Sequence, residues 1–179
     1  MRVFRFRVLC DENDEFYRDF DLTSEHTLFD FHQAIQKELS FDPSQMACFF
    51  TCNQEWEKEQ EFILFEVEDD LESSTIVMDV ALLTEFITEP RQRLIYVYDQ
   101  IEDRQLFIEL IDNPEYNSKR KYPVCVDREG DAPEQNMDED FSQIEEGSGK
   151  EFNYYDDEYL NELDPEEGFS FENIDDYDL

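Results

Sequence analysis

Glycine is almost absent from this chain of 179 residues. The four glycines all lie in its C-terminal third, at Gly130, Gly147, Gly149 and Gly168. Phosphate-binding loops, dinucleotide-binding turns and the nucleophile elbow of α/β-hydrolases need glycine where the backbone approaches a ligand closely or turns sharply. The residues before Gly130 therefore contain none of these three motifs.

Basic residues are also scarce. The sequence has 14 Lys plus Arg against 49 Asp plus Glu, which gives a formal net charge of -35. Binding to nucleic acid or to an anionic membrane depends on cationic contacts, and no basic patch stands out along the chain. The composition argues against direct nucleic-acid or membrane binding, and it favours a protein partner with a basic surface.

A long apolar run is the third feature that the sequence lacks. No stretch approaches the ~18 apolar residues that would span a bilayer, and residues 1–7 alternate apolar and basic side chains instead of forming a signal peptide. We therefore expect a cytoplasmic protein. In that reducing compartment the four cysteines are expected to be buried thiols, and the strand-like spacing of Cys48 and Cys52 is poor for zinc.

Charge and composition divide the chain near residue 134. Residues 1–133 contain 13 basic and 31 acidic side chains, whereas residues 134–179 contain one basic residue and 18 acidic ones. The aromatic residues of the second part follow no helical or strand period. The sequence predicts an α+β domain over 1–133 and an acidic, flexible C-terminal tail over 134–179.

Two amphipathic segments near the N-terminus predict a β-hairpin with a defined register. In residues 4–8 and 16–22 the even positions are mostly apolar, while the odd positions are basic in the first segment and mostly acidic in the second. One antiparallel pairing satisfies both patterns, and a slip of one residue loses both. It sets Phe4 opposite Leu22 and Phe6 opposite Phe20 on the core face, and Arg5 opposite Asp21 and Arg7 opposite Asp19 outside.

A capped helix is predicted to follow this hairpin. Thr27 and Asp30 form a capping signature, and apolar residues recur at helical spacing over residues 28–39. His32 lies beside this apolar stripe. We expect it to be a residue at the boundary of the core rather than a catalyst.

The rest of the domain predicts four further strands, the last two of which form a second hairpin, and a second helix. Asp99 and Arg104 are placed to close the last hairpin. The resulting order β-β-α-β-β-α-β-β indicates one mixed or antiparallel sheet with helices packed on one face. The expected strands cover residues 46–52, 62–67, 94–98 and 106–111, and a short helix is expected between residues 80 and 87.

Three stretches carry short motifs. Residues 28–36 read L-F-D-F-H-Q-A-I-Q, residues 94–99 read L-I-Y-V-Y-D, and the third stretch combines Y-P-V-C at 122–125 with E-G-D-A-P-E at 129–134. In this order they resemble the plasmid pRiA4b ORF-3-like family, some members of which are labelled as insertion-element passenger proteins. The resemblance implies a sheet of β-grasp, ubiquitin-like character, and it brings no assigned reaction or cofactor.

The turn after Asp99 departs from the family's pattern. Members commonly continue as F-G-D-D-W-x-H, where this chain has Q-I-E-D-R-Q-L. Asp103 matches the pattern, but the aromatic residue, the glycine and the histidine are missing. Motif residues and this acidic turn together give a candidate functional surface, which consists of His32, Tyr98, Asp99, Glu102, Asp103, Tyr122 and Cys125.

Three classes of function are compatible with these features. The leading hypothesis is a non-enzymatic protein-interaction module whose acidic tail is directed at a basic protein surface, although acidic charge often serves only to keep a chain in solution. A second class is a metal-assisted hydrolase, because the carboxylates of Asp99, Glu102 and Asp103 are the type of ligand that Mg²⁺ and Ca²⁺ prefer. A third is a nucleic-acid mimic that occupies the cleft of a DNA-binding protein.

Overall fold

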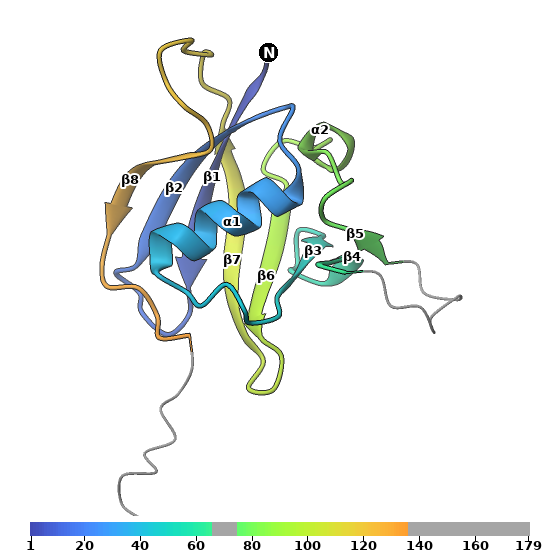
Figure 1. Cartoon of the computed structure of the whole chain (residues 1–179), viewed down its shortest axis with the longest axis vertical. Coiled ribbons are helices and arrows are strands. Elements are labelled where there is room, and N and C mark those ends of the chain that lie inside the picture. The colour runs from blue at the N-terminus through green and yellow to red at the C-terminus, as the bar shows by residue number, and fades with distance from the viewer. Residues whose placement is uncertain (66–74, 136–179) are drawn as a thin grey trace, which may run out of the picture. The chain divides into compact units, whose positions relative to one another are not determined.

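The fold was analysed in a computed structural model of the chain, which describes residues 1–65 and 75–135 (Figure 1). Almost all of the predicted acidic tail therefore lies outside the described residues. Neither helix in the described part has the length and apolar character needed to cross a membrane. Along the chain the elements are β1 (Val3–Cys10), β2 (Tyr17–Thr23), α1 (Leu28–Leu39), β3 (Cys48–Cys52), β4 (Lys58–Ile63), β5 (Ile76–Val77), α2 (Leu83–Phe86), β6 (Arg93–Asp99), β7 (Arg104–Asp112) and β8 (Val124–Glu129).

The strands form a single mixed sheet, as the sequence predicted. Its eight strands lie in the order β5-β4-β3-β6-β7-β1-β2-β8. The β4–β5 pair is parallel and the other neighbouring pairs are antiparallel. With only two helices among the described residues, the domain is an α+β structure in which the sheet predominates.

The predicted register of the first hairpin is confirmed. Phe6 pairs with Phe20, and Arg7 pairs with Asp19, as the alternation of apolar and charged residues required. Two of the three guanidinium nitrogens of Arg7, Nε and Nη2, donate to the Asp19 carboxylate, each at 2.8 Å. The Asp19 side chain is not at the surface, however, because β8 pairs with the other edge of β2 and leaves this residue only 4% exposed. The face that was expected to be open to solvent is therefore partly covered.

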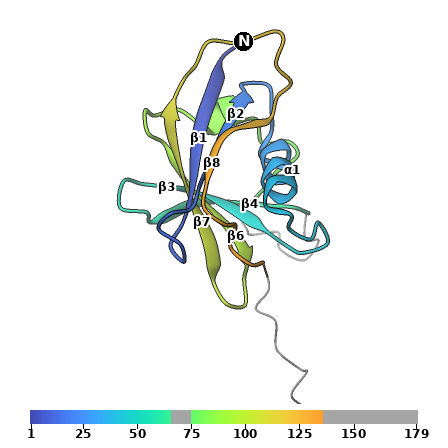
Figure 2. The same ribbon diagram turned by 90° about the vertical axis from the view of Figure 1, so that its left-hand side faces the viewer.

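Helix α1 crosses the sheet, and its buried side chains pack at the centre of the core (Figures 1 and 2). Its predicted capping box is present: the Thr27 hydroxyl accepts from the backbone N–H of Asp30, and the Asp30 carboxylate accepts from the backbone N–H of Thr27. The ring of Phe31 is fully buried and contacts aromatic rings from three different strands. These are Phe6 on β1, Phe20 on β2 and Phe49 on β3.

Three strands depart from the prediction. Strand β4 begins at Lys58 rather than near residue 62, and the last residues of the predicted strand 62–67 lie outside the described residues. Strands β5 and β8 were not predicted. The first four residues of β4 and the last three of β8 are polar or charged, so they lack the apolar alternation that marks a half-buried strand. The β6–β7 hairpin is as expected, with Asp99 paired with Arg104.

Candidate functional site

His32 is buried in the core. His32 is only 3% exposed. Its Nδ1 shares a hydrogen bond of 2.9 Å with the hydroxyl group of Tyr96 on β6. Burial lowers the pKa of His32 from 6.5 to about 4, so the imidazole is neutral at neutral pH. The prediction of a boundary residue is therefore wrong. The prediction failed because it considered only the apolar face of the helix, and His32 lies at the edge of that face. In the folded protein the aromatic rings of Phe29 and Tyr96 pack against the imidazole and bury it.

Tyr98 lies at one end of the same strand and is only 2% exposed. Its hydroxyl donates to Glu12 at 3.3 Å, and Arg104 donates to both carboxylate oxygens of Glu12 at 2.7 and 2.6 Å. The hydrogen bonds from Arg104 hold the pKa of Glu12 below its usual value. The Tyr98 ring also packs against Phe41. These contacts join the β1–β2 turn to the β6–β7 hairpin and leave Tyr98 inaccessible to a partner.

Carboxylates of the acidic turn between β6 and β7 contact groups of the domain itself. Asp99 Oδ1 accepts from the backbone N–H groups of Ile101 and Glu102, at 2.9 and 3.2 Å. The carboxylate of Asp103 lies 3.8 Å from the ammonium group of Lys58. Across residues 1–65 and 75–135, no three His, Cys, Asp or Glu side chains form a group that could hold a metal ion. The turn therefore does not gather its three carboxylates as a ligand set.

Tyr122 and Cys125 lie near the other edge of the sheet. The Tyr122 hydroxyl accepts from the backbone N–H of Asn117 at 3.2 Å. The Cys125 thiol donates to the backbone oxygen of Asp127 at 3.3 Å, and burial raises the pKa of this thiol to about 11. A protonated thiol is a poor nucleophile at neutral pH. Cys125 is on β8 and Tyr98 on β6, and three strands separate these two, which corresponds to a spacing of about 19 Å between the strands across the sheet. The seven predicted residues do not form one site.

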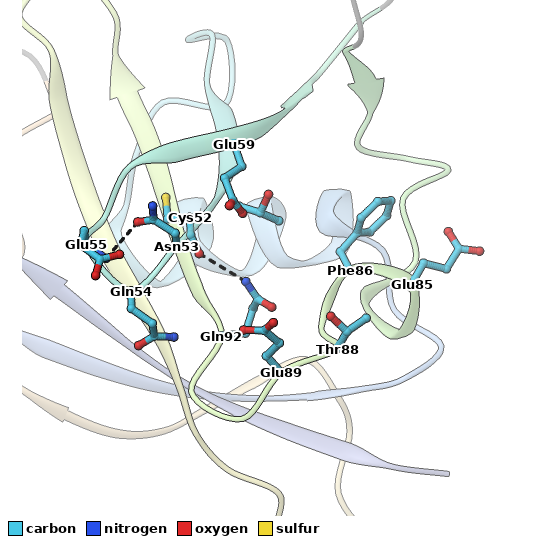
Figure 3. Close-up of a pocket in the computed structure, with 11 residues that line it drawn as sticks. Cys52, Asn53, Gln54, Glu55, Glu59, Glu85, Phe86, Thr88, Glu89 and Gln92 are labelled. Atoms are coloured by element: carbon cyan, nitrogen blue, oxygen red, sulfur yellow. Dashed lines mark hydrogen bonds between the residues drawn. The ribbon is translucent and has the colours of Figure 1, made fainter.

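Instead, the structure shows a cleft that the sequence did not predict (Figure 3). Its volume is about 490 Å³. Residues of the β3–β4 hairpin form one side, and α2 with the loop that follows it forms the other. Six of its lining residues define what we call the acidic cleft: Glu55, Glu59, Glu85, Phe86, Glu89 and Gln92.

The acidic cleft is strongly negative. Its lining contains four glutamates and no Lys or Arg. Within the described part of the chain, none of the four glutamates forms an ion pair. Uncompensated carboxylates on both sides of a concave surface concentrate the negative potential in the space between them. The cleft is thus suited to attract a cationic group.

Two other residues give the acidic cleft its shape. Phe86 packs edge-on against Phe62 of β4, with ring centroids 4.6 Å apart, which anchors α2 to the sheet. Gln92 is 8% exposed, and its amide nitrogen donates to the backbone oxygen of Cys52 at 3.5 Å. Figure 3 shows Gln92 between the hairpin side and the α2 side of the cleft. A cationic side chain that enters would therefore meet an aromatic ring and a buried amide as well as carboxylates.

No local signal in the sequence could have located this cleft. Residues 53–60 are recognisable as a segment rich in glutamate, Glu85 lies within the short helix α2, and Glu89 follows that helix. Their proximity depends on the parallel pairing of β5 with β4, which brings the chain back before α2. Strand β5 has only two residues, and a strand of that length leaves no periodic pattern.

Comparisons with known proteins agree with the fold. Among solved structures, the chain is similar to the crystal structure of a protein of unknown function, MM3350, from Methanosarcina mazei Go1, with a TM-score of 0.63. The sequences are 17% identical, and the match covers 74% of this chain and 71% of that chain, so the likeness shows a shared fold. A search of curated proteins finds no match.

The family comparison confirms the resemblance that the three sequence motifs carried. Two of these motifs are in contact in the structure, through the hydrogen bond between His32 of α1 and Tyr96 of β6. The model of the plasmid pRiA4b ORF-3-like protein family matches residues 2–175. This match extends well beyond the described domain and includes most of the predicted tail. Because it spans nearly the whole sequence, the chain belongs to the plasmid pRiA4b ORF-3-like protein family.

Proposed function

We propose that this protein is a non-enzymatic interaction module that binds a basic segment of a partner protein in its acidic cleft. The observation that carries the proposal is the set of four glutamates that line one cleft without a cation among them. The overall charge of -35 adds to it, because a strongly negative molecule attracts cationic surfaces from a distance. The predicted tail, which has 18 acidic residues and one basic residue, would contribute to the same long-range attraction.

Charge alone would give only weak binding. Each exposed ion pair contributes about 0–1 kcal/mol, because solvent screens it and two long side chains lose freedom. The acidic cleft offers additional contacts, since Phe86 can pack against a guanidinium plane or the apolar stem of a lysine. Arginine fits this combination better than lysine, because its planar group stacks on aromatic rings and binds carboxylates with two hydrogen bonds.

We also propose that the fold is of the β-grasp type. The support is the first hairpin, β1–β2, followed by a helix that crosses the sheet (Figure 1). The mixed sheet agrees with this assignment. A fold of this kind presents function through its surfaces and loops, so the assignment by itself names no partner.

The proposal is tested by titrating the full-length protein into a short labelled peptide of alternating arginine and serine residues and following the fluorescence anisotropy. We expect saturable binding that weakens as NaCl rises. Replacing the four cleft glutamates together, as Glu55→Gln, Glu59→Gln, Glu85→Gln and Glu89→Gln, should weaken binding by about ten-fold or more.

A matched control changes the charge by the same amount elsewhere on the domain. Its four exposed positions have no ion pair with a described residue: Glu15→Gln, Glu25→Gln, Glu115→Gln and Glu129→Gln. This variant should bind the peptide within about two-fold of the wild type, because the distant charges are screened. Equal losses in the two variants would show that net charge, and not the acidic cleft, attracts the peptide.

A further inference from the structure

We propose that the acidic cleft binds a basic loop of a second copy of this chain, so that the protein associates with itself. The inference rests on the proposed function and names the partner. We define the basic loop as residues 116–122, which read Y-N-S-K-R-K-Y and lie between β7 and β8. Figure 1 shows this part of the chain projecting beyond the end of the sheet.

The first observation is the charge of the basic loop. Lys119, Arg120 and Lys121 are consecutive, although the whole chain has only 14 Lys plus Arg. No acidic residue occurs from Asn117 to Val126. All three basic residues are exposed, and neither lysine forms an ion pair with a described residue. The basic loop therefore presents two ammonium groups that are available to carboxylates of another molecule.

The second observation is that contacts within the domain hold the basic loop in one shape. The rings of Tyr116 and Tyr122 stack with centroids 5.7 Å apart, and the backbone N–H of Asn117 donates to the Tyr122 hydroxyl at 3.2 Å. The guanidinium group of Arg120 donates to Asp21 at 2.9 Å. A segment that is already held loses less conformational freedom when it binds.

The ion pair of Arg120 directs the basic loop away from the acidic cleft of its own chain. Asp21 is on β2, which lies three strands from β6, about 14 Å across the sheet. The acidic cleft lies on the other side of β6, between the β3–β4 hairpin and α2. The contact is therefore expected between two molecules and not within one.

The basic loop and the acidic cleft lie at the same end of the sheet. The backbone oxygen of Gln92, which lines the cleft, accepts from the backbone N–H of Leu110 near the end of β7. The chain leaves β7 after Asp112 and then forms the basic loop. Two copies that meet at these ends each supply one loop and one cleft, which is the reciprocal arrangement of a twofold dimer.

The formal charge of -35 on each copy opposes this association at low salt. At about 0.15 M NaCl the Debye length is about 8 Å, so repulsion between distant parts of the two copies is screened more than lysine–glutamate contacts inside a cleft. We expect sedimentation velocity of the full-length protein at this salt concentration to show a monomer–dimer equilibrium. A sedimentation coefficient that stays constant up to about 1 mM protein would overturn the proposal.

The cleft variant, with the four glutamate-to-glutamine changes given above, tests the acidic side of the contact. It changes the formal net charge by four, from -35 to -31. Weaker repulsion alone would make this variant associate more tightly, whereas we expect association about ten-fold weaker than that of the wild type. The four-glutamate control has the same net charge and should associate at least as tightly as the wild type. An equal or greater tendency of the cleft variant to dimerise would contradict the proposal.

The loop variant, Lys119→Gln with Lys121→Gln, tests the basic side. We expect it to associate about ten-fold more weakly than the wild type. Its matched control is Arg2→Gln with Lys37→Gln, which removes two exposed cations that have no ion pair with a described residue. This control should stay within about two-fold of the wild type, because its charges lie outside the contact.

Mixing the two variants tests whether the loop and the cleft contact each other. The loop variant supplies an intact cleft and the cleft variant an intact loop, so an equimolar mixture should form more dimer than either variant alone. No recovery on mixing would mean that the basic loop binds some other surface, and the proposal would be wrong.

The arginine–serine peptide separates this inference from the proposed function. The loop variant keeps all four cleft glutamates, so it should bind the peptide at least as tightly as the wild type. Peptide binding by a protein that does not associate with itself would overturn the inference and leave the proposed function standing. Failure of the peptide to bind the cleft would contradict the proposed function, whatever the sedimentation data show.

Discussion

His32 and Tyr96 form a polar pair inside an aromatic core. Tyr96 is 1% exposed, and its ring packs against Phe49 and His32. Burial raises the pKa of the Tyr96 hydroxyl and lowers that of the imidazole, so both groups are neutral over the physiological range. A neutral pair satisfies its hydrogen-bonding groups without a buried charge. Its role is to fix the position of α1 on the sheet, and we assign it no catalytic function.

This pair makes a prediction about pH. The folded-state pKa of His32 is about 4, whereas an unfolded histidine has a pKa of about 6.5. Between these values the unfolded chain binds more protons, so stability is complete above pH 6.5 and falls as the pH drops toward 4. The loss from this residue should reach about 3 kcal/mol. Urea denaturation midpoints measured across this range test the expectation.

The variant His32→Phe isolates this effect from the titration of the carboxylates. Both proteins share the same acidic residues, so the difference between their pH profiles reports His32. We expect a shallower decline for His32→Phe between pH 6.5 and 4. Parallel profiles would mean that the imidazole is protonated in the folded protein as readily as in the unfolded one.

At the scale of the element, the β1–β2 hairpin depends on carboxylates that are buried against arginines. Asp21 is 1% exposed and accepts from Arg5 at 2.6 and 2.9 Å and from Arg120 at 2.9 Å. Asp21→Ala would leave two guanidinium groups without their shared partner, which should cost about 3–5 kcal/mol. Chemical denaturation measures this loss directly.

A more exposed ion pair provides the control for Asp21. Arg91 and Glu109 are 2.6 Å apart, and their side chains are 75% and 15% exposed, against 27% and 1% for Arg5 and Asp21. Glu109→Ala should therefore cost less, about 1 kcal/mol, because solvent can replace Glu109 at the Arg91 guanidinium. Comparable losses in Asp21→Ala and Glu109→Ala would contradict the view that burial makes the hairpin pair important.

Two residues at element ends adopt the left-handed conformation, and they predict opposite effects. Gly130 follows β8 with φ of 69°, and a Cβ there would lie 2.8 Å from the backbone oxygen of Glu15. Gly130→Ala should destabilise the domain by about 2 kcal/mol, because strain and a backbone clash combine.

Ser40 ends α1 with φ of 59°, and Ser40→Gly should stabilise the domain by about 1 kcal/mol. Thermal unfolding of both variants shows whether the first loses stability and the second gains it. A stabilised Gly130→Ala would refute the steric argument.

The elements that could be predicted are those with a local pattern, such as the alternation of charge and polarity in β1 and β2 or the capping signature and helical spacing of α1. Arg5 and Arg7 face Asp21 and Asp19 in the register that the sequence requires. Strand β8 was missed because only its first three residues are apolar, and it is formed by pairing with the free edge of β2. His32 was placed at the boundary because helical periodicity describes one helix and contains no information on the rings of the opposing strands. The acidic cleft needed the tertiary fold for the same reason.

At the scale of the whole molecule, the described residues contain one large cluster of buried hydrophobic side chains. Gln135 is the last described residue, and its amide holds the backbone of Asp42. We predict that a chain ending after Gln135 still unfolds in one sharp transition, because the eight strands and both described helices precede that point. Differential scanning calorimetry and far-UV circular dichroism provide the measurement. A truncated chain without a cooperative transition would show that the predicted tail is required for the fold.

The net charge makes a final prediction, because salt should affect stability and partner binding in opposite directions. Among the described residues, eight basic side chains pair with six carboxylates, and the four glutamates of the acidic cleft lie outside these pairs. The Debye length falls from about 30 Å at 0.01 M salt to about 3 Å at 1 M, which weakens repulsion between distant carboxylates more than it weakens buried pairs in contact. Denaturation midpoints should therefore rise with NaCl.

Binding of the arginine–serine peptide should weaken over the same range, because screening removes the attraction between the acidic cleft and a cation. The two trends together are more informative than either alone. A denaturation midpoint that falls with salt would mean that ion pairs such as Arg7–Asp19 stabilise the fold by more than repulsion among the excess carboxylates destabilises it. Peptide binding that stays constant while the midpoint rises would place the contact on an apolar surface instead of the four glutamates, and the proposed function would then fail although the charge argument for stability holds.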